Sequence, residues 1–313
     1  MNKLLYYIVF TIWYLLSLLP FWVHYILSDL IYLVLYKLIG YRVRIVRKNL
    51  EDSFPEKSVD ELRVIERRFY HRLCDYFVEL VKTMSVSERQ MRRRMVFKGT
   101  DIINQLAEEG QSIALYLGHT FNWEWITLLP VCITDKIHCG QLYHALENPV
   151  FDKLLLRQRQ RWGAECIALV DILRKTVEYK RKNQPTIIGY IGDQVPHWNN
   201  IHHWCWFLNH DTPVMTGAER IACKNHQAVI YLDMRQTKRG HYEAEFILVT
   251  REPEKLAEFE LTDIYFRKLE ESIRHQPELW LWSHNRWKRT REEFNERFRV
   301  VDGKVIPKDE SCI

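Results

Sequence analysis

The chain has 313 residues, of which 47% are hydrophobic and 27% charged, and its formal net charge at pH 7 is +5. This composition excludes an intrinsically disordered chain, and 11 Gly and 10 Pro without a short repeat exclude a fibrous or low-complexity protein. The 11 Trp, 16 Tyr and 14 Phe favour contact with a membrane interface, lipid or carbohydrate, although a large core would also use them.

The first 40 residues are strongly apolar. No charged residue occurs from Leu4 to Val23, a run about as long as the ~20 apolar residues that cross a bilayer. Pro20 lies inside this run, where it would kink or break a helix or mark a re-entry into the interface. We therefore expect residues 1–40 to be a membrane anchor that either spans the bilayer or lies deep in its interface. A buried N-terminal helical hairpin is the alternative, and a signal peptide is not favoured, because no small-residue cleavage site follows.

The next residues indicate the side of the membrane. Arg42, Arg44, Arg47 and Lys48 follow the apolar segment directly, and the positive-inside rule places such residues in the cytoplasm. The seven cysteines are scattered and include no Cys-x-x-Cys pair, which is typical of free thiols in a reducing compartment. Since no linker, repeat or composition break follows residue 50, we expect residues 41–313 to form one domain that faces the cytoplasm.

Residues 58–82 have the pattern of an amphipathic helix. Ser58 and Glu61 form a capping box, and apolar residues follow at helical spacing from Leu62 to Leu80. Arginines occupy the opposite face, and four more lie between positions 89 and 94. Such a basic surface is either a solvated face or, beside a membrane anchor, a surface that attracts anionic head groups or an acidic carrier protein.

From residue 99 onward, helical and strand patterns alternate. Buried or alternating apolar runs predict strands at 112–117, 137–143, 164–168, 186–191, 228–233 and 242–249. Helical periodicity and helix stop signals predict helices at 100–109, 122–132, 148–162, 170–182, 214–224 and 262–275. Interleaved strands and helices predict an α/β fold, with a mixed but mostly parallel sheet covered by helices on both faces.

The most informative residues follow the strand at 112–117. His119 comes after Gly118, and Glu124 follows five positions later, where a helix begins. In an unbroken helix the two side chains would lie about 140° apart, so they meet only if His119 sits in the turn before the helix. That turn lies at the carboxyl end of a strand, where α/β sheets build their sites. A neutral imidazole there can take a proton from an alcohol or amine, while Glu124 accepts a hydrogen bond from its other nitrogen. The alternative is a histidine that only caps the helix.

His-x4-Glu with Asn-Trp-Glu after a hydrophobic strand is similar to the late (lauroyl/myristoyl-type) acyltransferases of lipid A biosynthesis. These belong to the wider group of lysophospholipid acyltransferases with a His-x4-Asp/Glu motif. Further similar stretches follow in the family's order, namely Gly192-Asp193-Gln194, residues 206–222, and Pro277-Glu278-Leu279-Trp280-Leu281-Trp282-Ser283-His284-Asn285-Arg286-Trp287-Lys288. The chain departs from the family at Phe121, where many members have Gly, and at Trp206-Phe207-Leu208, which keeps the Phe-Phe-Gly segment only in part.

This resemblance implies a glycerolipid-acyltransferase-like fold and an enzyme at the bacterial inner membrane. Such an enzyme transfers an acyl chain from a thioester, acyl carrier protein or acyl-CoA, to a hydroxyl of a lipid A precursor. His119 would be the base and Glu124 would orient it, with no covalent intermediate, metal or cofactor. The expected substrate-binding residues are Asn122, Arg157, Arg159, Arg161, Asp193, Gln194, His284, Arg286 and Lys288. Of the three arginines between 157 and 161, the sequence does not identify which one meets a phosphate.

Two other interpretations remain beside this one. The acceptor is another membrane lipid, such as a lysophospholipid, glycolipid or aminolipid, or the chain is a non-catalytic lipid-binding membrane protein of the same fold. A metal site is not expected, because the histidines near Asp193 and Asp211 lack the spacing of metal ligands on a helix; these are His197, His202, His203 and His210. Nucleic-acid binding is not expected either, because the net charge is modest and no nucleic-acid motif is present.

Overall fold

The computed structural model describes residues 3–301 and 303–308. Its centre is a seven-stranded sheet with the strand order β1-β9-β8-β2-β5-β3-β4. The strands are β1 (Met95–Lys98), β2 (Ile113–Leu117), β3 (His138–Tyr143), β4 (Glu165–Ala168), β5 (Thr186–Ile191), β8 (Ala228–Lys238) and β9 (His241–Thr250). All neighbours pair in parallel except β8 and β9, which form an antiparallel hairpin. The predicted mixed, mostly parallel sheet is therefore confirmed.

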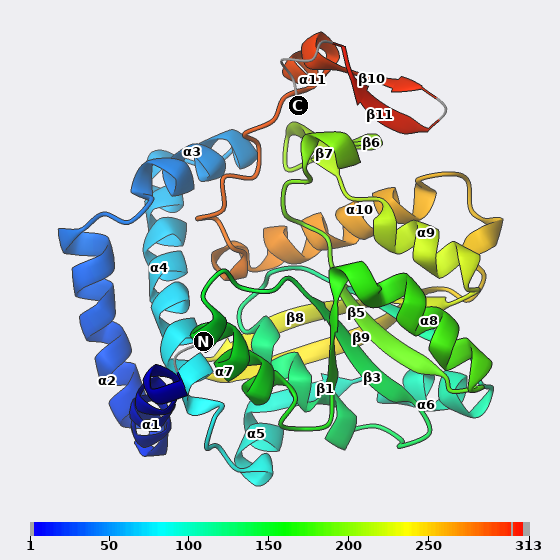
Figure 1. Cartoon of the computed structure of the whole chain (residues 1–313). Coiled ribbons are helices and arrows are strands. Elements are labelled where there is room, and N and C mark those ends of the chain that lie inside the picture. The colour runs from blue at the N-terminus through cyan, green and yellow to red at the C-terminus, as the bar shows by residue number, and fades with distance from the viewer. Residues whose placement is uncertain (1–2, 302, 309–313) are drawn as a thin grey trace.

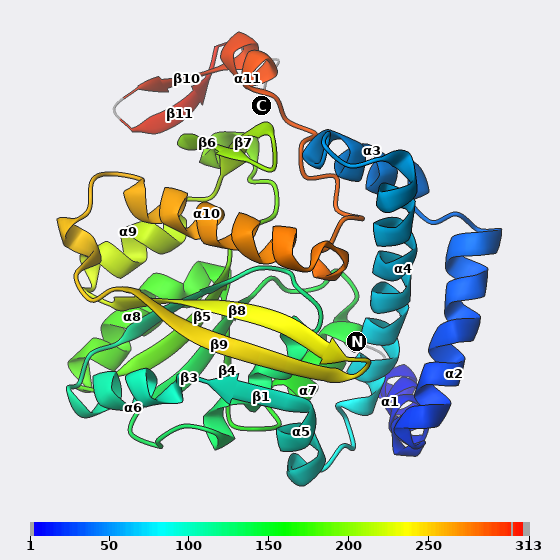
Figure 2. The same ribbon diagram turned by 180° about the vertical axis from the view of Figure 1, so that it is seen from behind.

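Helices cover both faces of this sheet, as Figures 1 and 2 show. Along β2, Ala114 and Tyr116 face a core that includes α10 (Glu260–His275) and α9 (Gly217–Lys224). Ile113, Leu115 and Leu117 face a second core, which includes α6 (Thr100–Glu108) and the 3-10 helix η2 (Trp123–Val131). Alternate residues of a strand point to opposite faces, so this strand is buried on both sides and reads as a continuous apolar run.

Most predicted elements are present, with shifted boundaries. The predicted helix at 122–132 is the 3-10 helix η2, which contains Pro130. The predicted helices at 148–162 and 170–182 are α7 (Pro149–Arg159) and α8 (Ile172–Arg181), the latter preceded by η3 (Leu169–Asp171). The structure adds elements that the sequence pattern did not predict: α3 (Val43–Ser53), α5 (Glu88–Arg94), β1, the hairpin of β6 (His203–Phe207) and β7 (His210–Val214), and the segment of α11 (Arg291–Arg297), β10 (Phe298–Val301) and β11 (Lys304–Pro307).

The apolar N-terminal residues form α1 (Lys3–Leu18) and α2 (Phe21–Tyr32), which continues as the π-helical turn η1 (Leu33–Leu38). Within the described residues, the helix Phe21–Leu38 is long and apolar enough to cross a membrane, and 17% of it is buried. It lies along α4 (Val59–Lys82) (Figure 1), and Tyr25 and Asp29 of α2 also accept hydrogen bonds from Arg239 in the turn between β8 and β9. The predicted capping box at Ser58 and Glu61 is confirmed at the start of α4.

Polar contacts join these N-terminal helices to α4. We call them the polar seam: they run from Tyr25 to Glu79, from Ser28 to Asp75, from Tyr36 to Glu66, and from Lys82 to the carbonyl oxygens of Ser17 and Leu19, at distances of 2.7–3.0 Å. The opposite face of the N-terminal helices exposes large apolar side chains, among them Trp22, Ile26 and Leu30. The N-terminal segment is thus docked by polar groups on one side and apolar on the other.

Candidate active site

His119 lies in the turn that follows β2, at the carboxyl end of the strand. Its Nδ1 lies 2.5 Å from Oδ1 of Asp193, and its backbone N–H donates to Oδ2 of the same carboxylate over 2.8 Å. Gly118 permits this approach, because a Cβ at that position would lie 2.5 Å from Leu269 Cδ1 and 3.3 Å from Asp193 Oδ2. A side chain at position 118 would therefore require the buried Leu269 side chain to shift.

Asp193 reaches His119 because β2 and β5 are parallel neighbours, so that the residues after both strands emerge at one edge of the sheet. The Trp280 indole N–H donates to Oδ2 of Asp193 over 2.8 Å, which gives the buried carboxylate a third donor. Burial alone would raise the pKa of Asp193, but the charge and hydrogen bonds of His119, with the Trp280 indole, outweigh burial and lower it to about 2. The carboxylate therefore stays ionised and accepts a hydrogen bond from Nδ1, which carries the proton of the neutral imidazole.

The other face of the imidazole remains reachable. The amide Nε2 of Gln194 lies 3.3 Å from His119 Nε2, and 17% of the His119 side chain is exposed. With Nδ1–H donated to Asp193, Nε2 is the unprotonated nitrogen: its lone pair points away from the carboxylate, accepts from the Gln194 amide in this structure, and is the one that can act as a base. The predicted site residues His119, Asp193 and Gln194 are thus brought together by the fold.

Glu124 does not hold the position that the sequence predicted for it. Its buried carboxylate accepts two hydrogen bonds from the Arg159 guanidinium of α7, at 2.9 and 2.5 Å, instead of one from His119. Asn122 lies in the turn between them, and its Oδ1 caps the Glu124 N–H over 3.2 Å. Because η2 begins at this cap, Glu124 is directed toward α7, and the carboxylate that contacts His119 is Asp193. The expected hydrogen bond between His119 and Glu124 is therefore absent, and that expectation was wrong.

The three arginines of the 148–162 segment have different surroundings. Arg159 pairs with Glu124, while the Arg157 guanidinium lies over the Phe10 ring of α1, 4.6 Å from its centroid. Arg161 donates to the carbonyl oxygen of Thr83 over 2.7 Å, just after α4. Of the three, Arg159 is the one whose side chain joins the loop that carries His119 and Glu124.

The C-terminal motif at 277–288 contacts the segments that flank the site. His284 Nε2 accepts the Val195 N–H over 3.2 Å, and burial together with the nearby charge of Arg286 lowers the pKa of His284 to about 4. Arg286 is fully buried and donates to the carbonyl oxygen of Pro213 over 2.7 Å, and burial lowers its pKa to about 10. Lys288 is exposed. His284 and Arg286 thus brace the segments beside Asp193, and neither is an open cation at the surface.

The histidines of the 197–210 segment are dispersed among different partners. His203 Nε2 lies 2.8 Å from Asp263 Oδ1, and His210 stacks on the Trp287 ring, with the centroids 3.8 Å apart. Asp211 pairs with Arg291 instead. In the part of the chain that the structure describes, no group of three His, Cys, Asp or Glu side chains is placed to hold a metal ion.

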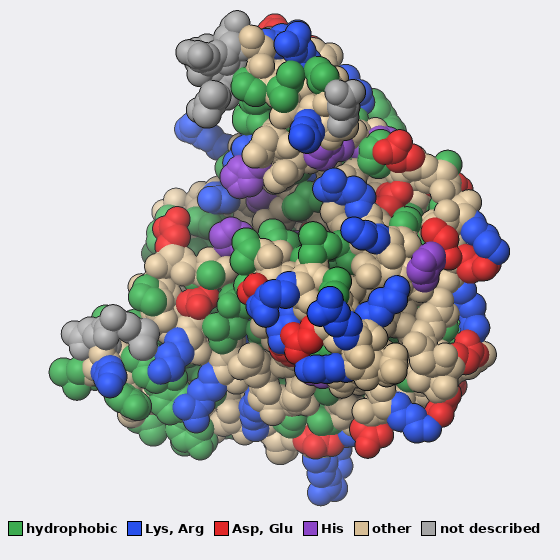
Figure 3. Space-filling model, turned by 45° about the vertical axis from the view of Figure 1, so that its right-hand side comes forward, with side chains coloured by type: hydrophobic (Ala, Val, Ile, Leu, Met, Phe, Trp, Pro, Cys, Tyr) green, Lys and Arg blue, Asp and Glu red, His purple; other side chains and the backbone are tan. Residues whose placement is uncertain are grey.

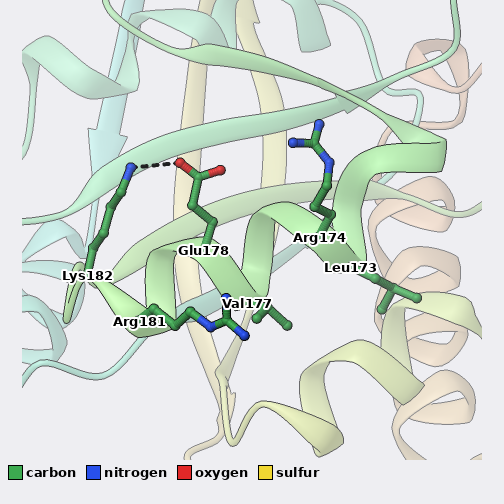
Figure 4. Close-up of a pocket in the computed structure, with 6 residues that line it drawn as sticks. All are labelled: Leu173, Arg174, Val177, Glu178, Arg181 and Lys182. Atoms are coloured by element: carbon green, nitrogen blue, oxygen red, sulfur yellow. Dashed lines mark hydrogen bonds and ion pairs between the residues drawn. The ribbon is translucent and has the colours of Figure 1, made fainter.

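The surface is hollowed between the body of the sheet and the part of the molecule that carries β6, β7 and the C-terminal hairpin, and histidine side chains border this hollow (Figure 3). A separate concavity of about 600 Å³ lies on α8. Leu173, Arg174, Val177, Glu178, Arg181 and Lys182 line it, and a hydrogen bond joins Lys182 to Glu178 (Figure 4). All six of these residues belong to α8 or its C-terminal end, so this concavity is not the space beside His119.

Two contributors were missed by sequence reasoning. Trp280 belongs to the C-terminal motif, and its role as a donor to Asp193 has no local sequence signal. Glu79, which accepts a hydrogen bond from Asn122 over 2.9 Å, was passed over within the amphipathic pattern. A carboxylate beside the apolar stripe of Tyr76 and Leu80 was the available signal.

Comparison with known proteins identifies the family of the chain. The family model of the bacterial lipid A biosynthesis acyltransferases matches residues 1–289. No curated protein sequence matched the chain. The family indicates an acyltransferase, and hence a protein that uses an acyl donor and a lipid acceptor. The chain belongs to the bacterial lipid A biosynthesis acyltransferase family.

Proposed function

We propose that the protein is a membrane-associated O-acyltransferase that moves a fatty acyl chain from a thioester donor to a hydroxyl of a lipid A precursor. The observation that carries this proposal is the His119–Asp193 pair at the carboxyl ends of β2 and β5. The exposed part of His119 favours catalysis over the alternative of a non-catalytic lipid-binding protein, because a substrate hydroxyl can reach the imidazole.

The proposed reaction uses both nitrogens of the His119 imidazole. Nε2 of His119 takes the proton of the acceptor hydroxyl, and the alkoxide oxygen attacks the thioester carbonyl carbon. The C–O bond forms as the C–S bond breaks, and the imidazolium returns its proton to the departing thiolate. Asp193 holds the imidazole in the required tautomer and stabilises its charged form. No acyl group is attached to the enzyme in this sequence.

Arg159 and Glu124 supply the second part of the proposed site. A guanidinium that is fixed on two oxygens of Glu124 is held in one orientation, and its planar donors suit a phosphate or a developing oxyanion. The Arg159 side chain is 23% exposed, so an anionic group of the donor or acceptor can reach it. Glu124 thus acts as the orienting partner of Arg159, while Asn122 positions the turn between Glu124 and His119.

We further propose that residues 1–40 anchor residues 41–313 to the cytoplasmic face of the inner membrane by lying in its interface. Both ends of the apolar helix Phe21–Leu38 contact α4: the Lys82 ammonium lies over the Phe21 ring, and the Tyr36 hydroxyl donates to Glu66. A helix that crossed the bilayer would carry α4 with it, including buried carboxylates and exposed arginines, at a cost of roughly 3 kcal/mol or more per charge at the centre. The basic cluster at 42–48 fits contact with anionic head groups.

The donor remains a choice between acyl carrier protein and acyl-CoA, and the acceptor between a lipid A precursor and another membrane lipid. The test offers ¹⁴C-lauroyl thioesters of both donors to the purified full chain in mixed micelles, with separate lipid A precursor and phospholipid acceptors. His119→Ala should lower transfer by roughly 10²- to 10⁴-fold, the usual contribution of a general base.

The matched control is His203→Ala. His203 also contacts an aspartate, Asp263, but this pair joins β6 to α10 and does not include a residue of the proposed site. This variant should retain its rate. Undiminished transfer by folded His119→Ala would contradict the proposed chemistry. Transfer to phospholipid but not to the lipid A precursor would instead favour the alternative acceptor.

A further inference from the structure

Glu79 is a fully buried carboxylate on the face of α4 that contacts both the N-terminal helix and the active-site loop. Its Oε1 accepts the Tyr25 hydroxyl of α2 over 3.0 Å. Its Oε2 accepts the Tyr242 hydroxyl of β9 and the Asn122 amide Nδ2, each over 2.9 Å. Three elements distant in the sequence therefore meet at one carboxylate.

The contact with Asn122 leads directly into the proposed site. Asn122 donates through Nδ2 to Glu79 and accepts the Glu124 N–H through Oδ1, so its amide is fixed at both ends. The side chains of Asn122 and Glu79 are both fully buried, and the hydrogen bonds of the Glu79 carboxylate go to Tyr25, Asn122 and Tyr242. Any movement of the Asn122 amide changes the start of η2, and with it the positions of Glu124 and His119.

A carboxylate at this position is costly for stability. Burial and the neighbouring charge of Asp75 raise the pKa of Glu79 to about 7, although all three of its partners donate to it. An apolar side chain of similar length would remove the cost of burying this group. An apolar side chain could not, however, accept the hydrogen bond from Asn122 of the active-site loop, which the carboxylate does.

From this arrangement we propose that Glu79 is a positioning residue for acyl transfer, which holds the loop between His119 and Glu124 through Asn122. Tyr25 of α2 and Tyr242 of β9 donate to the carboxylate itself, and in Figure 2 α4 lies between α2 and the end of the β8–β9 hairpin. This inference rests on the proposed function, because it assigns Glu79 a role in the rate of that reaction.

The first experiment replaces the acceptor. Glu79→Met removes the hydrogen bond to Asn122 and should lower kcat by roughly 10- to 100-fold, the scale of a small misplacement of catalytic groups, with KM within about threefold. Glu79→Gln keeps an amide oxygen that can accept from Asn122 and should restore most of kcat. The matched control is Glu66→Met, because Glu66 is also a buried carboxylate of α4 and accepts from Tyr36 and Arg47, but does not contact the active-site loop.

A second experiment exchanges donor and acceptor and does not depend on the folding of Glu79→Met. Asn122→Asp keeps the oxygen that caps Glu124. It replaces the amide nitrogen that donates to Glu79 over 2.9 Å with a second oxygen, so that two acceptors face each other. This change should lower kcat to a similar extent. Adding Glu79→Gln to it restores a donor opposite an acceptor and should raise kcat at least fivefold above that of Asn122→Asp.

Rates are measured with ¹⁴C-lauroyl thioesters and the lipid A precursor, alongside the reactivity of His119 toward diethyl pyrocarbonate by peptide mapping. Equal kcat values for Glu79→Met and Glu66→Met, or failure of the double variant to recover, would overturn the positioning role. If His119→Ala also retains activity, the proposed function fails instead. If His119→Ala is inactive while Glu79→Met is normal, only the inference about Glu79 fails.

Discussion

At the scale of single residues, the orientation of His119 depends on the charge of Asp193. The carboxylate has no proton to donate, so Nδ1 must carry one and Nε2 must be the base. An Asn at position 193 would offer an N–H to Nδ1 and favour the opposite tautomer. Asp193→Asn should therefore lower kcat by roughly 10³- to 10⁴-fold while the fold is kept.

The tautomer can be observed directly by ¹⁵N NMR of histidine-labelled protein, with His119 assigned from His119→Ala. In Asp193→Asn, the protonated nitrogen should change from Nδ1 to Nε2. Asp263→Asn serves as the control, because it alters the carboxylate beside His203 and leaves His119 untouched. An unchanged rate in Asp193→Asn would show that the imidazole is oriented by another group.

His284 predicts how stability depends on pH. Its pKa is lowered to about 4 in the folded protein, by burial and then by Arg286, whereas the ordinary value is 6.5. Between these two pH values the unfolded chain binds more protons than the folded one, so acid favours unfolding. The contribution of His284 to the free energy of unfolding is therefore fully present above pH 6.5 and is lost as the pH falls toward 4. Denaturant midpoints measured from pH 7 to pH 4 should fall less in His284→Gln than in the original protein. Parallel curves for the two proteins would contradict this assignment.

The sequence predicted residues of the site better than their partners. His119, Asp193, Gln194 and Glu124 could be singled out because each follows a predicted strand or begins a helix. Their pairing could not, because Glu124 is five residues from His119 in the chain but Asp193 is 74, and the contact arises from the adjacency of β2 and β5. Sequence spacing favours the near carboxylate, whereas strand order selects the distant one.

At the scale of elements, the same limit separates what was predicted from what was missed. Long periodic segments such as α4 and α10 were predicted close to their true bounds. β1 was missed because it has four residues and a mixed burial pattern, and its identity as a strand depends on β9 beside it. Within α4, the roles of the charged residues that face the N-terminal helices could not be predicted, because they depend on how those helices pack against α4.

The polar seam makes a quantitative prediction for α4. Asp75 is fully buried and accepts from Ser28 and from Arg239, with the closest Arg239 contact at 2.6 Å. Removing Arg239 leaves the buried carboxylate with the Ser28 hydroxyl and the longer contact of Arg72 at 3.4 Å, so the roughly 3–5 kcal/mol of a fully broken buried pair is an upper bound. Arg239→Ala should therefore lower the free energy of unfolding by up to about that amount, measured by denaturant titration in detergent.

An exposed pair provides the comparison. Arg274 contacts Glu270 and Glu56 at the surface, so Arg274→Ala should cost about 1 kcal/mol or less. Adding Asp75→Asn to Arg239→Ala should recover part of the loss, since the amide is neutral. If Arg239→Ala and Arg274→Ala destabilise equally, the seam does not depend on this buried charge.

At the scale of the whole molecule, the polar seam and the apolar outer face together predict how the enzyme meets the membrane. Trp22, Ile26 and Leu30 lie at spacings of four along α2 and are 66%, 52% and 53% exposed. Burying each such side chain in lipid contributes roughly 1.5–3 kcal/mol, so the double change Trp22→Glu and Ile26→Glu should weaken binding to anionic vesicles at least about 100-fold. Val300→Glu, which alters a 50% exposed residue of β10, should leave binding unchanged.

Whether the helices span the bilayer is decided by the turn between α1 and α2. If they lie in the interface, this turn stays on the cytoplasmic side, next to Lys82 and Ser85, whereas a spanning hairpin would expose it on the far side. Leu18→Cys in a cysteine-free chain should therefore resist a membrane-impermeant maleimide added to spheroplasts, and react once the cytoplasmic face of inverted vesicles is offered to the reagent. Labelling from outside would contradict the interfacial arrangement, because the contacts of Lys82 with Ser17 and Leu19 keep this turn at the end of α4. The Tyr25 hydroxyl of α2 and the Asn122 amide both donate to Glu79, so in the proposed arrangement one carboxylate joins the helix whose outer face would meet lipid to the loop that follows His119.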